Sequence, residues 1–299
     1  MATYIERFLA QLFAIEKETQ ASQQQTQQKN PIALFRKEFI LTKVKRLLHK
    51  PDEFSSFSVL HTALLRQLNT HHIDSGNLEH DVATLGLLYL NNTEIYRDDI
   101  EKLAQWCVQA LQTTEGRVIT QHWESLRFPE KLDYEHLIPT TTILRDGIAQ
   151  QTLSEKHWRE RDGFSLTDTG MSAQAVQNEI HYCIYCHDHD GDFCSKGFPN
   201  NKKEPSAGYK KNPLNTTLTG CPLEERISEM HLLKRDGWTI GALAMVMLDN
   251  PMCPATGHRI CNDCMKACIY QKQTPVNIPQ IETRVLSDVL ALPWGGGSL

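Results

Sequence analysis

The chain has 299 residues, of which 40% are hydrophobic and 22% charged, with a net charge of −5 and a pI of about 6.2. This balance argues against a nucleic-acid-binding protein, which needs a basic face along a phosphate backbone. The sequence has no run of eighteen apolar residues and no signal peptide at its N-terminus, so we predict no membrane association and a cytoplasmic location.

The N-terminal part is predicted to be mostly α-helical. Apolar residues recur at helical spacing over residues 5–13, and the glutamine-rich stretch "QASQQQTQQKN" after them predicts a solvated hinge. Asn30 and Pro31 are typical of the start of the next helix. Further helical patterns cover residues 55–73, 78–90, 94–113 and 135–150. No motif in residues 1–150 indicates a function.

Cysteine is distributed unevenly along the chain. Cys107 stands alone in the first 180 residues, within an amphipathic helical pattern, and is most simply a small buried side chain. The other eight follow the pattern Cys183-x2-Cys186-x7-Cys194-x26-Cys221-Pro222, then Cys253, then Cys261-x2-Cys264-x3-Cys268. In a reducing cytoplasm, cysteines at such short spacing indicate metal or redox ligands rather than disulfides.

The number and spacing of these cysteines favour two four-ligand sites. A single zinc ion would leave half of the thiols unused. Runs such as C-x2-C-x3-C, with proline after an interleaved cysteine, are typical of ferredoxin ligation. Residues 222–251 are predicted to form two short helices that break at Asp236-Gly237. Backbone N–H groups at such helix ends can donate to thiolate or sulfide. Spacing therefore favours iron–sulfur clusters and leaves zinc as an alternative.

Three histidines lie in the same segment, "HYCIYCHDHDGDFC". His181, His187 and His189 could serve zinc, although a polar loop that alternates histidine with aspartate is more often a solvated turn. "DHDGD" resembles the start of a calcium loop, but Pro199 stands at the twelfth position from Asp188, where a glutamate is required. The sequence therefore argues against calcium.

Residues 165–292 resemble the N-terminal iron–sulfur domain of the glutamate synthase small subunit and of dihydropyrimidine dehydrogenase. The resemblance is carried by the opening C-x-x-C, "GCPLEERISEMHLLKRDGWTIGALAMVMLDNP", and "ATGHRICNDCMKACIYQKQTPVNIPQIE". It implies an α-helical ferredoxin-like domain that binds two 4Fe–4S clusters. The fold class expected is thus mostly α, with a helical region of unknown role at residues 1–164 and the two-cluster domain at residues 165–299.

The resemblance also implies which residues hold the clusters. The first cluster is expected on the opening three cysteines and the last one, namely Cys183, Cys186, Cys194 and Cys268. The second is expected on Cys221, Cys261 and Cys264, with Glu282 as the fourth ligand and Cys253 as its rival. No residue is expected to be catalytic in the sense of making or breaking bonds.

The function implied is electron transfer within an oxidoreductase, in which an FAD accepts hydride from NADPH and the clusters relay single electrons. No G-x-G-x-x-G follows a predicted strand, and the chain ends at Leu299, where a flavin-binding domain would begin. We therefore expect FAD and NADPH on a flavin-containing partner or on a missing downstream domain. Two alternatives remain open: a zinc-stabilised protein-interaction module, and an inactive fragment of a longer flavoprotein. The segment of residues 195–220 is a polar insertion relative to this family and is expected at the surface.

Overall fold

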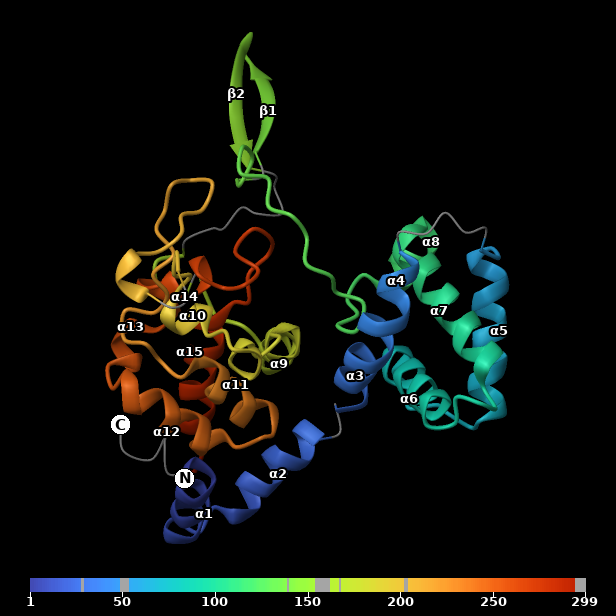
Figure 1. Cartoon of the computed structure of the whole chain (residues 1–299), viewed down its shortest axis with the longest axis horizontal. Helices are drawn as coiled ribbons and strands as arrows, with labels where there is room; N and C mark the ends of the chain where they lie inside the picture. Colours follow the sequence, from blue (N-terminus) through green and yellow to red (C-terminus); the bar gives the residue numbers. More distant parts are fainter. Residues whose placement is uncertain are drawn as a thin grey trace. The chain divides into compact units, whose positions relative to one another are not determined.

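The computed structural model describes residues 1–27, 30–48, 54–138, 140–153, 162–166, 168–201 and 204–293. This part of the chain is mostly helical, as the sequence predicts (Figure 1). None of its helices is long and apolar enough to cross a membrane. The C-terminal "WGGGSL" lies outside the described residues.

The chain forms two compact units. We call Met1–Thr19 with Pro129–Leu299 the cysteine-rich unit, and Gln20–Phe128 the helical unit. These units do not coincide with the domain boundary predicted between residues 164 and 165, because the N-terminal residues and residues 129–164 belong with the cysteine-rich unit.

The helical unit is organised around one apolar core. Phe35, Leu85 and Trp106 are almost fully buried in it, and so is Cys107, as predicted. Gly86 lets two helices approach closely, since a Cβ there would lie 2.3 Å from the Phe35 ring. The helices are α3 (Asn30–Phe35), π-helix η1 (Arg36–Val44), α4 (Lys45–Leu47), α5 (Phe57–Thr70), α6 (Leu78–Asn91), α7 (Arg97–Gln112) and α8 (Thr114–Thr120). The three helices predicted over residues 55–113 are thereby confirmed.

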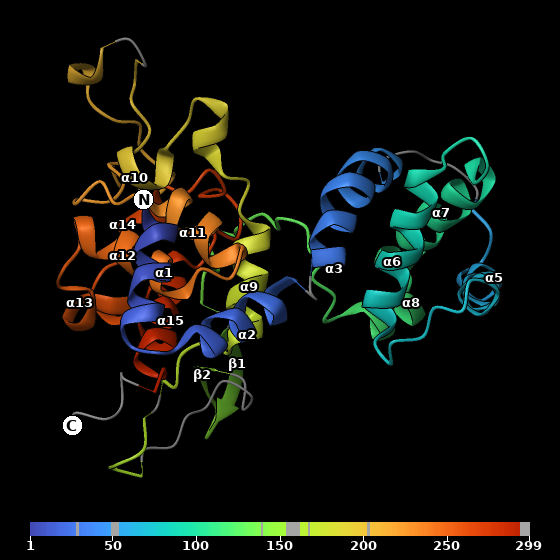
Figure 2. The same cartoon turned by 90° about the horizontal axis from the view of Figure 1, so that it is seen from below.

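The cysteine-rich unit is built from short helices joined by loops. Its core contains Ile180, Met230 and Ile281 together with several of the cysteines. The helices are α1 (Ala2–Leu12), α9 (Ala173–Tyr182), η3 (Cys186–His189), α10 (Phe193–Lys196), η4 (Pro205–Ala207), α11 (Ile227–Arg235), α12 (Thr239–Asp249), α13 (Cys253–Ile260), α14 (Asp263–Lys266) and α15 (Ile278–Leu290). Helix α1 packs on α12 (Figure 2), where Glu6 accepts a hydrogen bond from the Gly241 N–H at 2.9 Å. The predicted break between α11 and α12 is present.

Two local predictions are wrong. Residues 135–150 are not helical: Thr140–Arg145 (β1) and Ile148–Leu153 (β2) form an antiparallel hairpin. Three consecutive threonines favour a strand, and Asp146-Gly147 supplies the two positive φ angles of a tight hairpin turn. The glutamine-rich stretch is helical up to Gln27 rather than a hinge, because helix α2 spans Glu16–Gln27. Glutamine is a good helix former, and solvation does not prevent a helix.

Candidate metal centre

The four cysteines expected to hold the first cluster interact with one another in the cysteine-rich unit. Cys183 follows α9, Cys186 begins η3, Cys194 lies in α10 and Cys268 follows α14. Burial and, to a smaller extent, the charges of Cys268 and Cys186 raise the pKa of the Cys183 thiol to about 12. Burial and then the charges of Cys183 and Cys268 also raise the pKa of Cys194, with smaller contributions from Asp192 and from Cys264, which belongs to the second set. Four thiols from separate short helices and loops therefore lie near one another, three of them buried and Cys183 half-buried.

The residues expected around the second cluster form a similar group. The pKa of Cys264 lies well above its usual value because of burial and then the charges of Cys221, Glu282 and Cys261. Cys264 is 8% exposed and Glu282 is 8% exposed, although they come from α14 and α15. This set therefore joins three cysteines and one carboxylate that are dispersed in the sequence.

Backbone N–H groups donate to sulfur in both sets. The Tyr185 N–H donates to Cys183 Sγ at 3.4 Å, and Tyr185 has a positive φ of 52° that turns the chain around this sulfur. The other such donors are Val276, Tyr270 and Ile269 to Cys268, and Glu225 and Leu223 to Cys221. These hydrogen bonds lower the pKa values of Cys268 and Cys221 against the effect of burial. They favour the thiolate, which is the form that binds metal.

The two rivals for the fourth position, Glu282 and Cys253, contact each other. Cys253 is 1% exposed, and its thiol hydrogen-bonds to the Glu282 carboxylate. Asn250 Nδ2 donates to Glu282 Oε1 at 2.9 Å. The charges that act on Cys253 are those of Glu282 and Glu225, whereas those on Cys264 include Cys221 and Cys261. Burial and the Glu282 charge keep the pKa of Cys253 high, so this thiol is a hydrogen-bond donor to the carboxylate.

Sequence reasoning missed two residues of this site. Glu225 is 6% exposed, and its pKa is raised to about 7 by burial and then by the Glu282 charge, while a hydrogen bond with Asn250 lowers it. Asn250 is 4% exposed and serves both carboxylates. In the sequence, Asn250 is recognisable only as the residue before Pro251 at a helix end, so no local signal indicates its role.

A backbone hydrogen bond connects the two sets. The Cys221 N–H donates to the Cys194 carbonyl at 2.9 Å. Gly197 and Gly220 make this approach possible, since both have positive φ and a Cβ on Gly220 would lie 2.4 Å from Gly197 N. The polar insertion thus leaves and returns at one point, with its described residues between 200 and 217 mostly exposed.

Among the described residues, no three His, Cys, Asp or Glu side chains gather around one point as a single metal ion requires. Of the eight expected donors, five are buried, namely Cys186, Cys194, Cys264, Cys268 and Glu282. Cys183, Cys221 and Cys261 are half-buried. The nearby histidines have other contacts: His181 with Gln177 at 3.2 Å, and His187 with Asp188 at 3.2 Å.

Comparison with known proteins gives no function. No protein-family model matches the sequence, and no solved structure matches it. The uncharacterized protein RP006 of Rickettsia prowazekii (strain Madrid E) is 70% identical over 44 residues, which are 15% of this chain and 6% of that relative. The uncharacterized protein RP005 of the same strain is 24% identical over 250 residues, which cover 78% of each chain. The chain therefore matches only a small part of the first relative.

Proposed function

We propose that the cysteine-rich unit is an α-helical ferredoxin-like domain that binds two 4Fe–4S clusters and passes single electrons to or from a flavin-containing partner. The observation that carries this proposal is the grouping of the expected ligands. Cys183 and Cys268 interact despite their distance in the sequence, and Cys264 interacts with Cys221, Cys261 and Glu282. The resemblance to the glutamate synthase small subunit assigned these same two sets.

The surroundings of both sets suit this function. The clusters would supply one-electron chemistry, and the chain supplies their environment. Cys186, Cys194, Cys264 and Cys268 are buried away from water. Backbone N–H donors stabilise negative charge on Cys183, Cys221 and Cys268. No bond-making step is assigned to the chain itself, so the oxidoreductase chemistry belongs to the FAD and NADPH of the partner.

Glu282 is the fourth ligand of the second set in this proposal. Its carboxylate is held by Asn250 and by the Cys253 thiol, and it shares its surroundings with Cys264. Cys253 acts as a positioning residue, because a thiol that donates to a carboxylate remains protonated. A carboxylate ligand would give the second cluster a different potential from that of the first.

Metal analysis tests the proposal directly. Protein purified without oxygen should be brown and contain about eight iron and eight sulfide per chain, as two 4Fe–4S clusters require. It should contain no FAD, and dithionite but not NADPH should bleach its absorption. Adding a flavoprotein partner should restore bleaching by NADPH. Stoichiometric zinc without sulfide would overturn the proposal in favour of the zinc module.

A pair of variants tests the fourth ligand. Glu282→Gln should change the electron paramagnetic resonance spectrum of one reduced cluster and leave the other unchanged. Cys253→Ala should retain about eight iron per chain, because it removes only a hydrogen bond to the carboxylate. If Cys253→Ala loses a cluster and Glu282→Gln does not, Cys253 is the ligand.

A further inference from the structure

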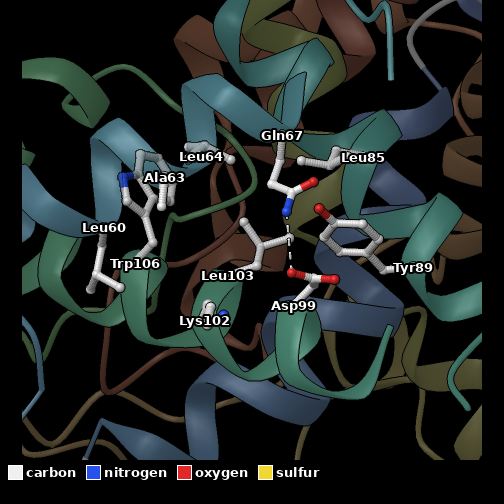
Figure 3. A pocket seen from close by; sticks show the side chains of 10 residues that line it. All are labelled: Leu60, Ala63, Leu64, Gln67, Leu85, Tyr89, Asp99, Lys102, Leu103 and Trp106. Carbon is white, nitrogen blue, oxygen red and sulfur yellow. Dashed lines mark hydrogen bonds between the residues drawn. The ribbon is translucent and has the colours of Figure 1, made fainter. Parts of the chain in front are cut away.

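The helical unit contains a small cavity of about 80 Å³ between α5, α6 and α7. Most of its wall is apolar and includes Leu60, Leu64 and Trp106. Figure 3 shows Gln67, Tyr89 and Asp99 turned toward one another at one end of it. The cavity therefore has an apolar body and one polar end, which is the usual character of a small-molecule site.

The polar end contains a hydroxyl group without a partner. Tyr89 is 1% exposed, and its hydroxyl has no hydrogen-bond partner among the described residues. Burial raises the pKa of this phenol, so it keeps its proton. Leaving such a buried group unpaired costs free energy. A ligand that hydrogen-bonds to the Tyr89 hydroxyl would remove this cost.

The polar end is also negatively charged. Asp99 on α7 is half-buried, and its Oδ1 accepts a hydrogen bond from Gln67 Nε2 at 3.4 Å. No described residue forms an ion pair with Asp99. Its charge reaches the Tyr89 hydroxyl, because it contributes to the raised pKa there. Carboxylate, phenol oxygen and the aromatic faces of Tyr89 and Trp106 all favour a cation.

The volume limits the size of that cation. An apolar cavity of about 150 Å³ holds a benzene ring, so about 80 Å³ holds only about three to four heavy atoms. We propose that this cavity binds a short primary alkylammonium ion. Its ammonium group donates to Asp99 and to the Tyr89 hydroxyl oxygen, and its alkyl chain packs against Leu60, Leu64 and Trp106. Lys102 is exposed at the same cavity and competes as a cation.

Calorimetric titration of the full chain with three probes of four heavy atoms each tests the role of charge. Propylammonium should bind, whereas propanol, which lacks the charge, and acetate, which reverses it, should bind at least tenfold more weakly. Equal binding of propylammonium and propanol would overturn the proposal, and so would an absence of propylammonium binding. These outcomes do not depend on the iron–sulfur proposal.

Variants identify the residues responsible. Asp99→Asn should weaken propylammonium binding at least tenfold, and Tyr89→Phe severalfold, while Lys102→Met should strengthen it. The control is Asp98→Asn on the same helix, which changes an exposed carboxylate that does not line the cavity, and its affinity should stay unchanged. An Asp99→Asn protein that is folded by circular dichroism and binds as the wild type does would overturn the proposal. If that variant does not fold, the titration of the wild-type chain with the three probes and the affinity of Lys102→Met for propylammonium decide whether the proposal holds.

Discussion

Cysteine is buried in both units, but its surroundings differ. In the helical unit, Cys107 is fully buried in an apolar cluster, and burial alone raises its pKa. In the cysteine-rich unit, Cys194 and Cys264 are buried beside other thiols and carboxylates, which raise their pKa values further. An isolated neutral thiol is stable in a core, whereas several acidic groups together are stable only when protonated or neutralised. Burial alone therefore does not identify a ligand; the neighbouring acidic groups do.

The largest expected effect is loss of one whole cluster. Cys183→Ser and Cys268→Ser should each reduce the iron content from about eight to about four per chain, and both should remove the same spectral component. The physical reason is that their thiols interact in one set. Iron analysis and electron paramagnetic resonance measure this.

The matched control comes from the other unit. Cys107→Ala should leave iron, sulfide and spectra unchanged, because this thiol interacts with no other cysteine charge. If Cys183→Ser and Cys268→Ser remove different components, the first set is assigned wrongly.

The next effect concerns the contact that joins the two sets. Gly220→Ala should lower the free energy of unfolding of the cysteine-rich unit by about 3 kcal/mol, from positive φ and close approach together. A Cβ there would lie 2.4 Å from Gly197 N and 2.5 Å from the Ser195 carbonyl oxygen. The control, Gly170→Ala, has a similar φ of +75° but meets only Gln280 Oε1 at 3.5 Å, and should cost about 1 kcal/mol. Chemical denaturation measures both, and equal effects would contradict the contact.

A smaller effect depends on pH. His231 on α11 is fully buried, neither ring nitrogen has a hydrogen-bond partner among the described residues, and burial lowers its pKa to about 3. Below about pH 6.5 the unfolded chain binds a proton at this histidine that the folded chain does not bind. The free energy of unfolding is therefore highest above about pH 6.5 and decreases as the pH falls toward 3. At pH 5 the loss should be about 2 kcal/mol. His231→Leu should remove this pH dependence, and an unchanged denaturation profile between pH 7 and 5 would contradict it.

The smallest effect is expected at Cys107. Cys107→Ser places a hydroxyl in the apolar core of the helical unit and should lower its free energy of unfolding by about 1 kcal/mol. Iron content should not change. Thermal denaturation followed by circular dichroism measures the difference, with Cys107→Ala as the reference for the lost sulfur. A change in iron content would mean that Cys107 also affects a cluster, and would contradict its interpretation as an isolated core thiol.

The helices with a strong apolar periodicity were predicted correctly from the sequence. The prediction was wrong where one segment fits both a helix and a strand. Helices α5, α6 and α7 follow directly from apolar residues at helical spacing. Residues 135–150 carry apolar residues that also fit a helix, and only the threonines and the Asp146-Gly147 turn favour the hairpin that forms. The local turn chemistry decides, because the strands are exposed and no core packing specifies their structure.

The residues of the candidate sites could also be predicted only in part from the sequence. Cysteine spacing indicates a metal-binding role, but the assignment of Cys268 to the first set came from the resemblance and not from spacing. Asn250 and Glu225 could not be predicted. Their role depends on how the end of α12 and the segment before α11 pack against Glu282 on α15. The cavity at Tyr89 is equally invisible in the sequence, since three helices must pack to enclose it.

The hydrogen bond from the Cys221 N–H to the Cys194 carbonyl has a consequence for electronic coupling. From the Cys194 sulfur, a path of covalent bonds runs through the side chain to this carbonyl, crosses a single N–H···O contact, and continues covalently to the Cys221 sulfur. With clusters bound as proposed, an electron tunnelling between them would cross no solvent gap on this path. Gly197 and Gly220, which permit this contact, would thereby keep that path through the protein continuous, although neither carries a side chain.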